Sequence, residues 1–113
     1  MRQFFLGRFE AQSNELYHNP NTGLRTYILS FPDGGAKLEI MSRPDTVDID
    51  PSEKNIGFIH LSFSVGSKEA VDGKTVELRN AGYTVNRGPR TTGDGYYESC
   101  ILGPEGIQLE ITV

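Results

Sequence analysis

The fold is decided by a short stretch near the C-terminus, Gly106–Ile111, which reads GIQLEI. An earlier stretch, Gly35–Ile40, reads GAKLEI and repeats its pattern. In both copies a glycine-containing turn precedes a strand in which leucine and isoleucine flank a glutamate, Glu39 or Glu110. Side chains alternate between the two faces of a strand, so the apolar residues face one way and the glutamate the other. The repeat predicts a duplicated module whose two halves face a shared site.

The composition indicates one small domain of 113 residues. Its formal net charge of −4 argues against a nucleic-acid or anionic-membrane surface, because such surfaces need clustered lysine and arginine. No apolar run reaches the ~18–20 residues of a membrane helix, and we expect no signal peptide. Cys100 is the only cysteine, so no internal disulfide can form. We therefore expect a cytoplasmic protein in which Cys100 is buried and unreactive.

The first half of the chain predicts a helix followed by three strands. We expect residues 1–41 to form an incomplete first module and residues 42–55, which hold two prolines and no apolar periodicity, to form a linker. The expected elements are a helix within Met1–Phe9 and strands at Glu10–Tyr17, Leu24–Phe31 and Ala36–Met41.

The second half, residues 56–113, predicts a complete module. The alternation in Ile56–Val65 indicates a strand, with His60 and Ser62 on its polar face. Ser67 is a candidate N-cap for a helix over Lys68–Ala81, whose apolar side follows the helical spacing of Val71, Thr75 and Leu78. Further strands are expected at Tyr83–Asn86, at Tyr96–Leu102 and, after a Gly103–Gly106 turn, up to Val113, with a loop at Arg87–Gly95. The first half is the same unit without its first strand, whose counterpart would lie before Met1.

Three polar side chains could converge if the two halves pack face to face. Glu39, His60 and Glu110 all lie on the polar faces of their strands. One imidazole and two carboxylates suit a divalent metal such as Zn, Ni, Co, Mn or Fe. Open coordination positions would accept a substrate with two adjacent oxygens, and the metal would polarise a carbonyl and stabilise an enediolate. The alternative for each residue is a purely structural role, as a solvated or hydrogen-bonded side chain on the polar face of its strand.

Three stretches carry a resemblance to a known family: Gly57–Val65, Gly88–Glu98 and Gly103–Ile111. The last resembles the D-P-[DE]-G-x-x-[IL]-E ending of the vicinal oxygen chelate (glyoxalase/bleomycin resistance/dioxygenase) superfamily, with Gly103 in place of the usual aspartate. The chain is most similar to the glyoxalase I-like (lactoylglutathione lyase-like) branch. This resemblance implies an α+β fold of paired βαβββ modules forming a cupped mixed sheet, the first module lacking its first strand.

The resemblance also implies roles for individual residues. Glu39 matches the metal-binding glutamate of the first module, and His60 and Glu110 match the ligands of the second, whereas the first-module histidine has no counterpart. Glu110 or Glu39 would be the catalytic base, and we favour Glu110 because its module is intact. Relatives of full length usually form homodimers, and in some of them two chains share a metal site, so dimerisation is implied.

The implied function is a metal-dependent carbon–sulfur lyase or isomerase acting on a small α-oxo substrate, such as methylglyoxal, or on its thiol adduct. Substrate contacts are expected from Thr92, Asp94 and Tyr96 of the glycine-rich loop, and from Arg90. The alternatives are an epimerase or iron dioxygenase of the same superfamily, a metal-free small-molecule-binding protein of the resistance type, and an inactive fragment. Dioxygenases are less favoured because they typically use two histidines, and only His60 is suitably placed.

Overall fold

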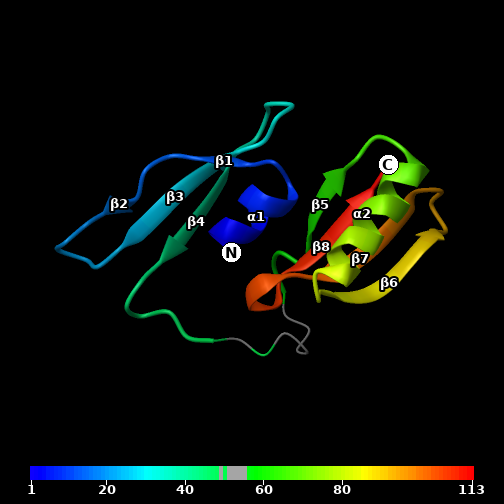
Figure 1. The fold of residues 1–113 in the computed structure, drawn as a ribbon. Helices are drawn as coiled ribbons and strands as arrows, with labels where there is room; N and C mark the ends of the chain where they lie inside the picture. Colours follow the sequence, from blue (N-terminus) through cyan, green and yellow to red (C-terminus); the bar gives the residue numbers. More distant parts are fainter. Residues whose placement is uncertain (49, 51–55) are drawn as a thin grey trace. The chain divides into compact units, whose positions relative to one another are not determined.

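The computed structural model describes residues 1–48, 50 and 56–113. The chain divides into two compact units, Met1–Ile49 and Asp50–Val113. The predicted linker over 42–55 lies partly outside the described residues. Within the described residues, each unit combines one α-helix with a four-stranded sheet (Figure 1), which confirms the predicted α+β fold class.

The first unit begins with a helix, as expected, and continues with four short strands. Its elements are α1 (Arg2–Arg8), β1 (Gln12–Ser13), β2 (Tyr17–His18), β3 (Arg25–Ser30) and β4 (Leu38–Ser42). All the strand pairings are antiparallel, and β3 lies between β4 and the two shortest strands. The expected strand over Glu10–Tyr17 is therefore split into β1 and β2. The break begins at Asn14, whose side-chain Oδ1 accepts a hydrogen bond from the Ile28 backbone N–H at 2.7 Å.

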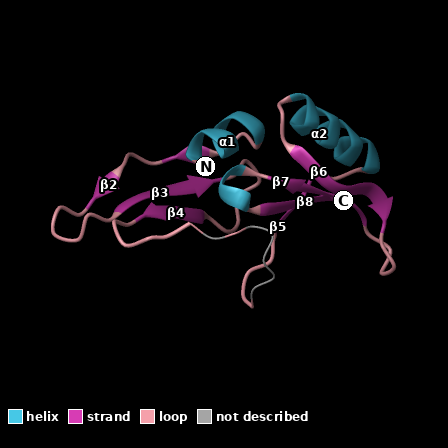
Figure 2. Cartoon of the chain, turned by 90° about the horizontal axis from the view of Figure 1, so that it is seen from below, coloured by secondary structure: helices cyan, strands magenta, loops and turns pink. Residues whose placement is uncertain are grey.

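The core of the first unit lies between α1 and its sheet (Figure 2). Phe4 and Phe5 are the buried residues of α1, and Phe5 is fully buried together with Leu29 of β3. The ring of Phe5 meets the ring of Phe31 edge-on, with centroids 6.1 Å apart. The aromatic run at the N-terminus thus forms a helix because it can bury one side against β3.

The second unit has the strand, helix and three strands predicted for the complete module. Its elements are β5 (Leu61–Ser64), α2 (Lys68–Asn80), β6 (Thr84–Thr91), β7 (Tyr97–Leu102), the short 3-10 helix η1 (Pro104–Gly106) and β8 (Gln108–Thr112). The sheet order is β5-β8-β7-β6, with β5 parallel to β8 and the other pairs antiparallel. A parallel pair needs a long crossover connection, and the chain between β5 and β8 provides one through α2.

Helix α2 covers one face of this sheet (Figure 2). The side-chain oxygen of Ser67 accepts a hydrogen bond from the Ala70 backbone N–H at 3.1 Å, which confirms the predicted N-cap. The buried residues of α2 are the three predicted from the helical spacing, Val71, Thr75 and Leu78. Beneath them the sheet contributes the fully buried Ile101, Leu109 and Ile111. Because Leu109 and Ile111 fill this face, Glu110 between them and its neighbour Ser62 lie on the opposite face.

Two predicted boundaries in the second unit were wrong. The strand expected over Ile56–Val65 is confined to Leu61–Ser64, and Phe58 is fully exposed rather than part of a paired strand. The loop expected over Arg87–Gly95 is instead largely strand, because β6 runs on to Thr91. Register shifts between Val85 and Arg90 accommodate the glycine and proline that suggested a loop.

None of the helices within the described residues is long and apolar enough to cross a membrane.

Candidate active site

The open face of the second sheet carries a row of polar side chains. In β8, Leu109 and Ile111 point into the core, so Glu110 between them points to the open face. In the parallel pairing of β5 with β8, Ser62 lies opposite Glu110. The pattern that singled out Glu110 in the sequence thus corresponds to a real division of the strand into a core face and an open face.

Both carboxylate oxygens of Glu110 have partners from the β5 side. The Ser62 hydroxyl donates a hydrogen bond to Oε1 at 2.7 Å. The Nε2 atom of His60 lies 3.5 Å from Oε2, and the His60 side chain is 42% exposed against 23% for Glu110. His60 immediately precedes β5, so it reaches Glu110 from the end of the strand. The structure therefore brings together two of the three predicted metal ligands.

Glu98 of β7 is a second carboxyl group beside Glu110, and the two side chains are hydrogen-bonded. The Glu98 side chain is only 12% exposed. Burial raises the pKa of Glu98, and the hydrogen bond to Glu110 and the negative charge of Glu110 raise it further, against an opposing effect of Arg90. Burial alone would also raise the pKa of Glu110, but hydrogen bonds from Ser62 and Glu98 and the electrostatic effect of His60 hold that pKa below its usual value. The two pKa values are thus shifted in opposite directions, so Glu110 loses its proton more readily than Glu98 does.

Sequence reasoning assigned no role to Glu98 or Ser62. Glu98 stands two residues before Cys100, the residue directly opposite Glu110, so the alternation of β7 places Glu98 on the same open face. This alternation was visible in the sequence, but the register that places Cys100 beside Glu110 was not. Ser62 was correctly expected on the polar face of its strand, and only the pairing of β5 with β8 reveals its carboxylate partner.

Arg90 and Cys100 lie near the carboxylates. The Nη2 atom of Arg90 lies 3.4 Å from Oε1 of Glu98, its partner across the β6–β7 pairing. Cys100 is buried, as predicted, and burial raises the pKa of its thiol despite the opposing hydrogen bond and charge of Arg87. A thiol held in its protonated form is a poor nucleophile, which agrees with the expectation that Cys100 is unreactive.

The three loop residues predicted to contact substrate form the tight connection between β6 and β7. The Thr92 hydroxyl donates a hydrogen bond to the Asp94 carboxylate, and the Thr92 backbone N–H donates to the Tyr96 carbonyl at 2.8 Å. The side chains of Thr92 and Asp94 thus stabilise the turn itself, whereas the side chain of Tyr96 is 59% exposed. Their contact with a substrate stays a prediction.

The third predicted ligand, Glu39, belongs to the first unit. It lies in β4 opposite Ile28 and is exposed. The prediction that Glu39 joins His60 and Glu110 around one ion stays a prediction. The imidazole and carboxylate of His60 and Glu110 have the donor chemistry of a divalent-metal site. However, nowhere in residues 1–48, 50 and 56–113 do three or more His, Cys, Asp or Glu side chains form a group ready to hold a metal ion.

A family model matches nearly the whole chain. Residues 3–111 match the Glyoxalase/Bleomycin resistance protein/Dioxygenase superfamily. The chain belongs to this superfamily. The resemblance carried by the Gly57–Val65, Gly88–Glu98 and Gly103–Ile111 stretches is therefore confirmed.

Solved structures of superfamily proteins share the fold at low sequence identity. The glyoxalase family protein from Enterococcus faecalis is 20% identical, with 99% of this chain and 85% of that chain covered and a TM-score of 0.78. A glyoxylase/bleomycin resistance protein/dioxygenase domain from Frankia is 17% identical, with 99% of this chain and 84% of that chain covered and a TM-score of 0.79. The trypanothione-dependent glyoxalase I of Leishmania major is 12% identical, with 97% of this chain and 73% of that chain covered and a TM-score of 0.73. No curated protein matches the chain.

Proposed function

We propose that this protein is a metal-dependent, glyoxalase I-like lyase or isomerase that acts on a small α-oxo substrate or its thiol adduct. The observation that carries the proposal is the pairing of His60 with Glu110 on the open face of the second sheet, with Nε2 and Oε2 3.5 Å apart. Membership of a superfamily that includes enzymes supports it, and so does the presence of a glyoxalase I among the proteins of the same fold.

His60 and Glu110 would hold a divalent ion, Zn, Ni, Co, Mn or Fe, through an imidazole nitrogen and a carboxylate oxygen. Glu39 is the proposed third ligand. When bound, the ion supplies Lewis-acid polarisation of the substrate oxygens.

The residues around Glu110 hold it as an oriented, ionised carboxylate. Its pKa is held below the usual value, which keeps it in the charged form that a metal ligand needs. We propose it also as the base that accepts the proton next to the substrate carbonyl, although the lowered pKa makes it a weaker base than an ordinary glutamate. Ser62 orients one carboxylate oxygen through its 2.7 Å hydrogen bond. Burial and the neighbouring Glu110 raise the pKa of Glu98, which favours the neutral form of Glu98 beside the charged Glu110. Glu39 remains the alternative base, and Arg90, Thr92, Asp94 and Tyr96 are the proposed substrate contacts.

The first experiment is elemental mass spectrometry of the purified protein. We expect stoichiometric divalent metal in the wild type and its loss in His60→Ala, because that change removes the only imidazole ligand. His18→Ala is the matched control, since it removes the other histidine, which lies in the first unit, and it should keep the metal.

Two further variants separate the carboxylates. Glu110→Gln and Glu39→Gln should each lower the metal content if both are ligands, and a variant that loses metal should also lose activity on methylglyoxal–thiol adducts. A wild type that takes up no metal after reconstitution, or a His60→Ala variant that keeps it, would contradict the proposal.

A second candidate is a metal-free protein that binds small molecules. One observation favours it: both oxygens of Glu110 already have protein partners, His60 and Ser62, and the described residues offer no ready group of three ligands. The same experiment decides between the two, because saturable ligand binding by a protein that never takes up metal supports the binder.

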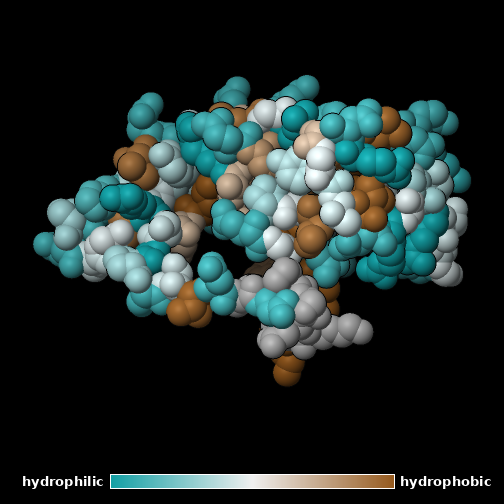
Figure 3. Space-filling view, turned by 60° about the horizontal axis from the view of Figure 1, so that its bottom comes forward, coloured by the Kyte–Doolittle hydropathy of each residue, from teal (hydrophilic) through white to brown (hydrophobic). Residues whose placement is uncertain are grey.

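We also propose that the protein forms a homodimer. The surface in Figure 3 is mostly polar, with separate apolar patches in brown. Among the exposed large apolar residues, Ile56, Phe58 and Ile59 fall within four consecutive positions and are 107%, 100% and 67% exposed. Clustered exposed apolar side chains mark surfaces that bind another protein.

The cytoplasmic location expected from the single cysteine stays a prediction.

A further inference from the structure

A row of polar side chains crosses one end of the first sheet. His18 of β2 lies opposite Arg25 of β3, and Arg25 lies opposite Ser42 of β4. Residues directly opposite each other in antiparallel strands project from the same face of the sheet. An imidazole, a guanidinium and a hydroxyl therefore stand side by side on one face, all contributed by the first unit.

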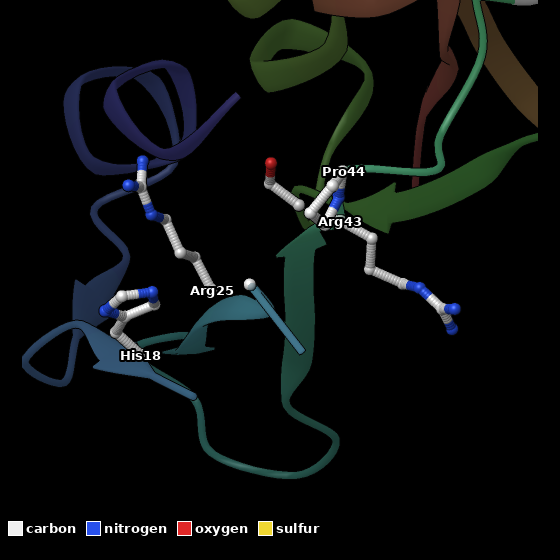
Figure 4. Close-up of a pocket in the computed structure, with 6 residues that line it drawn as sticks. His18, Arg25, Arg43 and Pro44 are labelled. Carbon is white, nitrogen blue, oxygen red and sulfur yellow. The ribbon is translucent and has the colours of Figure 1, made fainter. Parts of the chain in front are cut away.

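These three residues line a cavity of about 270 Å³. The rest of its lining comes from Gly23, Arg43 and Pro44. In Figure 4 the side chains of His18 and Arg25 lie next to each other, and the guanidinium of Arg43 points away from both. The cavity is thus flanked by the imidazole of His18 and by the permanently charged guanidinium of Arg25.

The two arginines of the cavity differ in their partners. Arg43 binds Asp45 with two hydrogen bonds, at 2.9 and 2.8 Å, so its charge is compensated within the chain. Within residues 1–48, 50 and 56–113, no acidic side chain pairs with Arg25. An uncompensated guanidinium beside a cavity is notable in a chain with a net charge of −4, where acidic residues outnumber basic ones.

The wall of the cavity is held in place by local structure. Gly23 has a φ of +71°, and a Cβ at this position would lie 2.6 Å from Cγ of Pro44, so only glycine allows the turn to approach the end of β4. Within this turn the Asn19 N–H donates to the Leu24 carbonyl at 2.9 Å, and the Gly23 N–H donates to the Asn19 carbonyl at 2.8 Å. These contacts fix the backbone of the turn that lines the cavity.

We propose that this cavity binds the oxyanionic group, a carboxylate or a phosphate, of a small molecule. The planar guanidinium of Arg25 offers parallel N–H donors that match two oxygens of such a group. The Ser42 hydroxyl and the His18 ring supply further donors on the same face. The site lies wholly in the first unit and requires neither the metal nor the carboxylates of the candidate active site.

The test is an NMR titration of the protein with inorganic phosphate and, separately, with acetate, following the signals of His18 and Arg25. We expect saturable shifts at both residues. Saturation by phosphate alone assigns a phosphate group, and saturation by acetate alone assigns a carboxylate. Arg25→Gln should weaken binding by about tenfold or more, since it removes a charged donor pair. Arg25→Lys, which keeps the charge and loses the fork, should give an intermediate affinity.

Arg79→Gln is the matched control, because Arg79 is also exposed and lies in the last turn of α2 in the other unit. It should bind as the wild type does. The titration is repeated after treatment with a chelator and should give the same affinity, so failure of the proposed metal site would leave this result standing. No saturable shift with either anion, or equal binding by Arg25→Gln in a folded protein, would overturn the proposal.

Discussion

Ser62 lies directly opposite Glu110 across the parallel pair of β5 and β8, and its hydroxyl donates a 2.7 Å hydrogen bond to the glutamate. The sequence separates these residues by most of the second module, and α2 provides the crossover that brings their strands together. The bond orients the Oε1 oxygen and leaves Oε2 toward His60. A residue with no evident chemistry of its own thus positions the proposed ligand and base.

Replacing Ser62 by alanine should weaken metal binding without destroying the site. Loss of a hydrogen bond that orients a ligand typically costs about 10–100-fold in metal affinity, and we expect a value near the lower end, because His60 and Glu98 still contact Glu110. Isothermal titration calorimetry with Zn²⁺ measures the effect. Ser64→Ala, two residues along the same strand, is the control, and equal affinities for the two variants would argue against a positioning role.

The hydroxyls of Thr75 and Ser99 should be energetically coupled. Both are almost fully buried, their oxygens are 2.6 Å apart, and the Thr75 hydroxyl also donates to the Val71 carbonyl. The single hydrogen of Thr75 is therefore used, and Ser99 donates to Thr75. Thr75→Val leaves the Ser99 hydroxyl without this acceptor and should lower the free energy of unfolding by about 1–3 kcal/mol.

Urea denaturation of Thr75→Val, Ser99→Ala and the double variant measures this coupling. The double variant removes both polar groups, so its destabilisation should be smaller than the sum of the two single effects. Strict additivity would show that the two hydroxyls stabilise the fold independently.

Tyr97 should ionise at a higher pH than an ordinary tyrosine. Its hydroxyl donates a 2.7 Å hydrogen bond to Asp72, and this bond, followed by desolvation and the charges of Asp72 and Glu69, raises the pKa of Tyr97. A pKa raised on folding contributes stability that is fully present below the unfolded value, about 10, and is lost as the pH rises through the folded pKa.

NMR titration of the Tyr97 ring carbons follows this ionisation directly. Asp72→Asn should bring the pKa of Tyr97 back toward its usual value, because it removes both the charged acceptor and its electrostatic effect. An unchanged titration of Tyr97 in this variant would mean that Asp72 is not the cause.

The exposed apolar residues before β5 should be needed for dimerisation. Burying a side chain such as Phe58 contributes about 1.5–3 kcal/mol. Phe58→Ser should therefore raise the dimer dissociation constant by about tenfold or more. Sedimentation equilibrium measures the change, with Val47→Ser as a control, since Val47 is 85% exposed outside this stretch. A wild type that is monomeric at all concentrations would rule out the homodimer.

The features that could be predicted correctly are those governed by near neighbours in the chain. The N-cap at Ser67 and the buried stripe of α2 follow from capping chemistry and the 3.6-residue helical period. Glu110 between Leu109 and Ile111 follows from the two-residue period of a strand. The errors fall where longer-range pairing overrides local signals: β6 continues through Gly88 and Pro89 because β7 pairs with it, and Ile56–His60 stays outside β5.

The sequence by itself determined the fold class, the superfamily and the face on which Glu110 lies, because periodicity and motif depend only on the order of residues. Only the tertiary structure decided which side chains surround Glu110 and which residues form the row of His18, Arg25 and Ser42. The physical reason is register. Which residues face each other across two strands depends on packing of the whole sheet and on the turns that join it, so no local pattern specifies the partners.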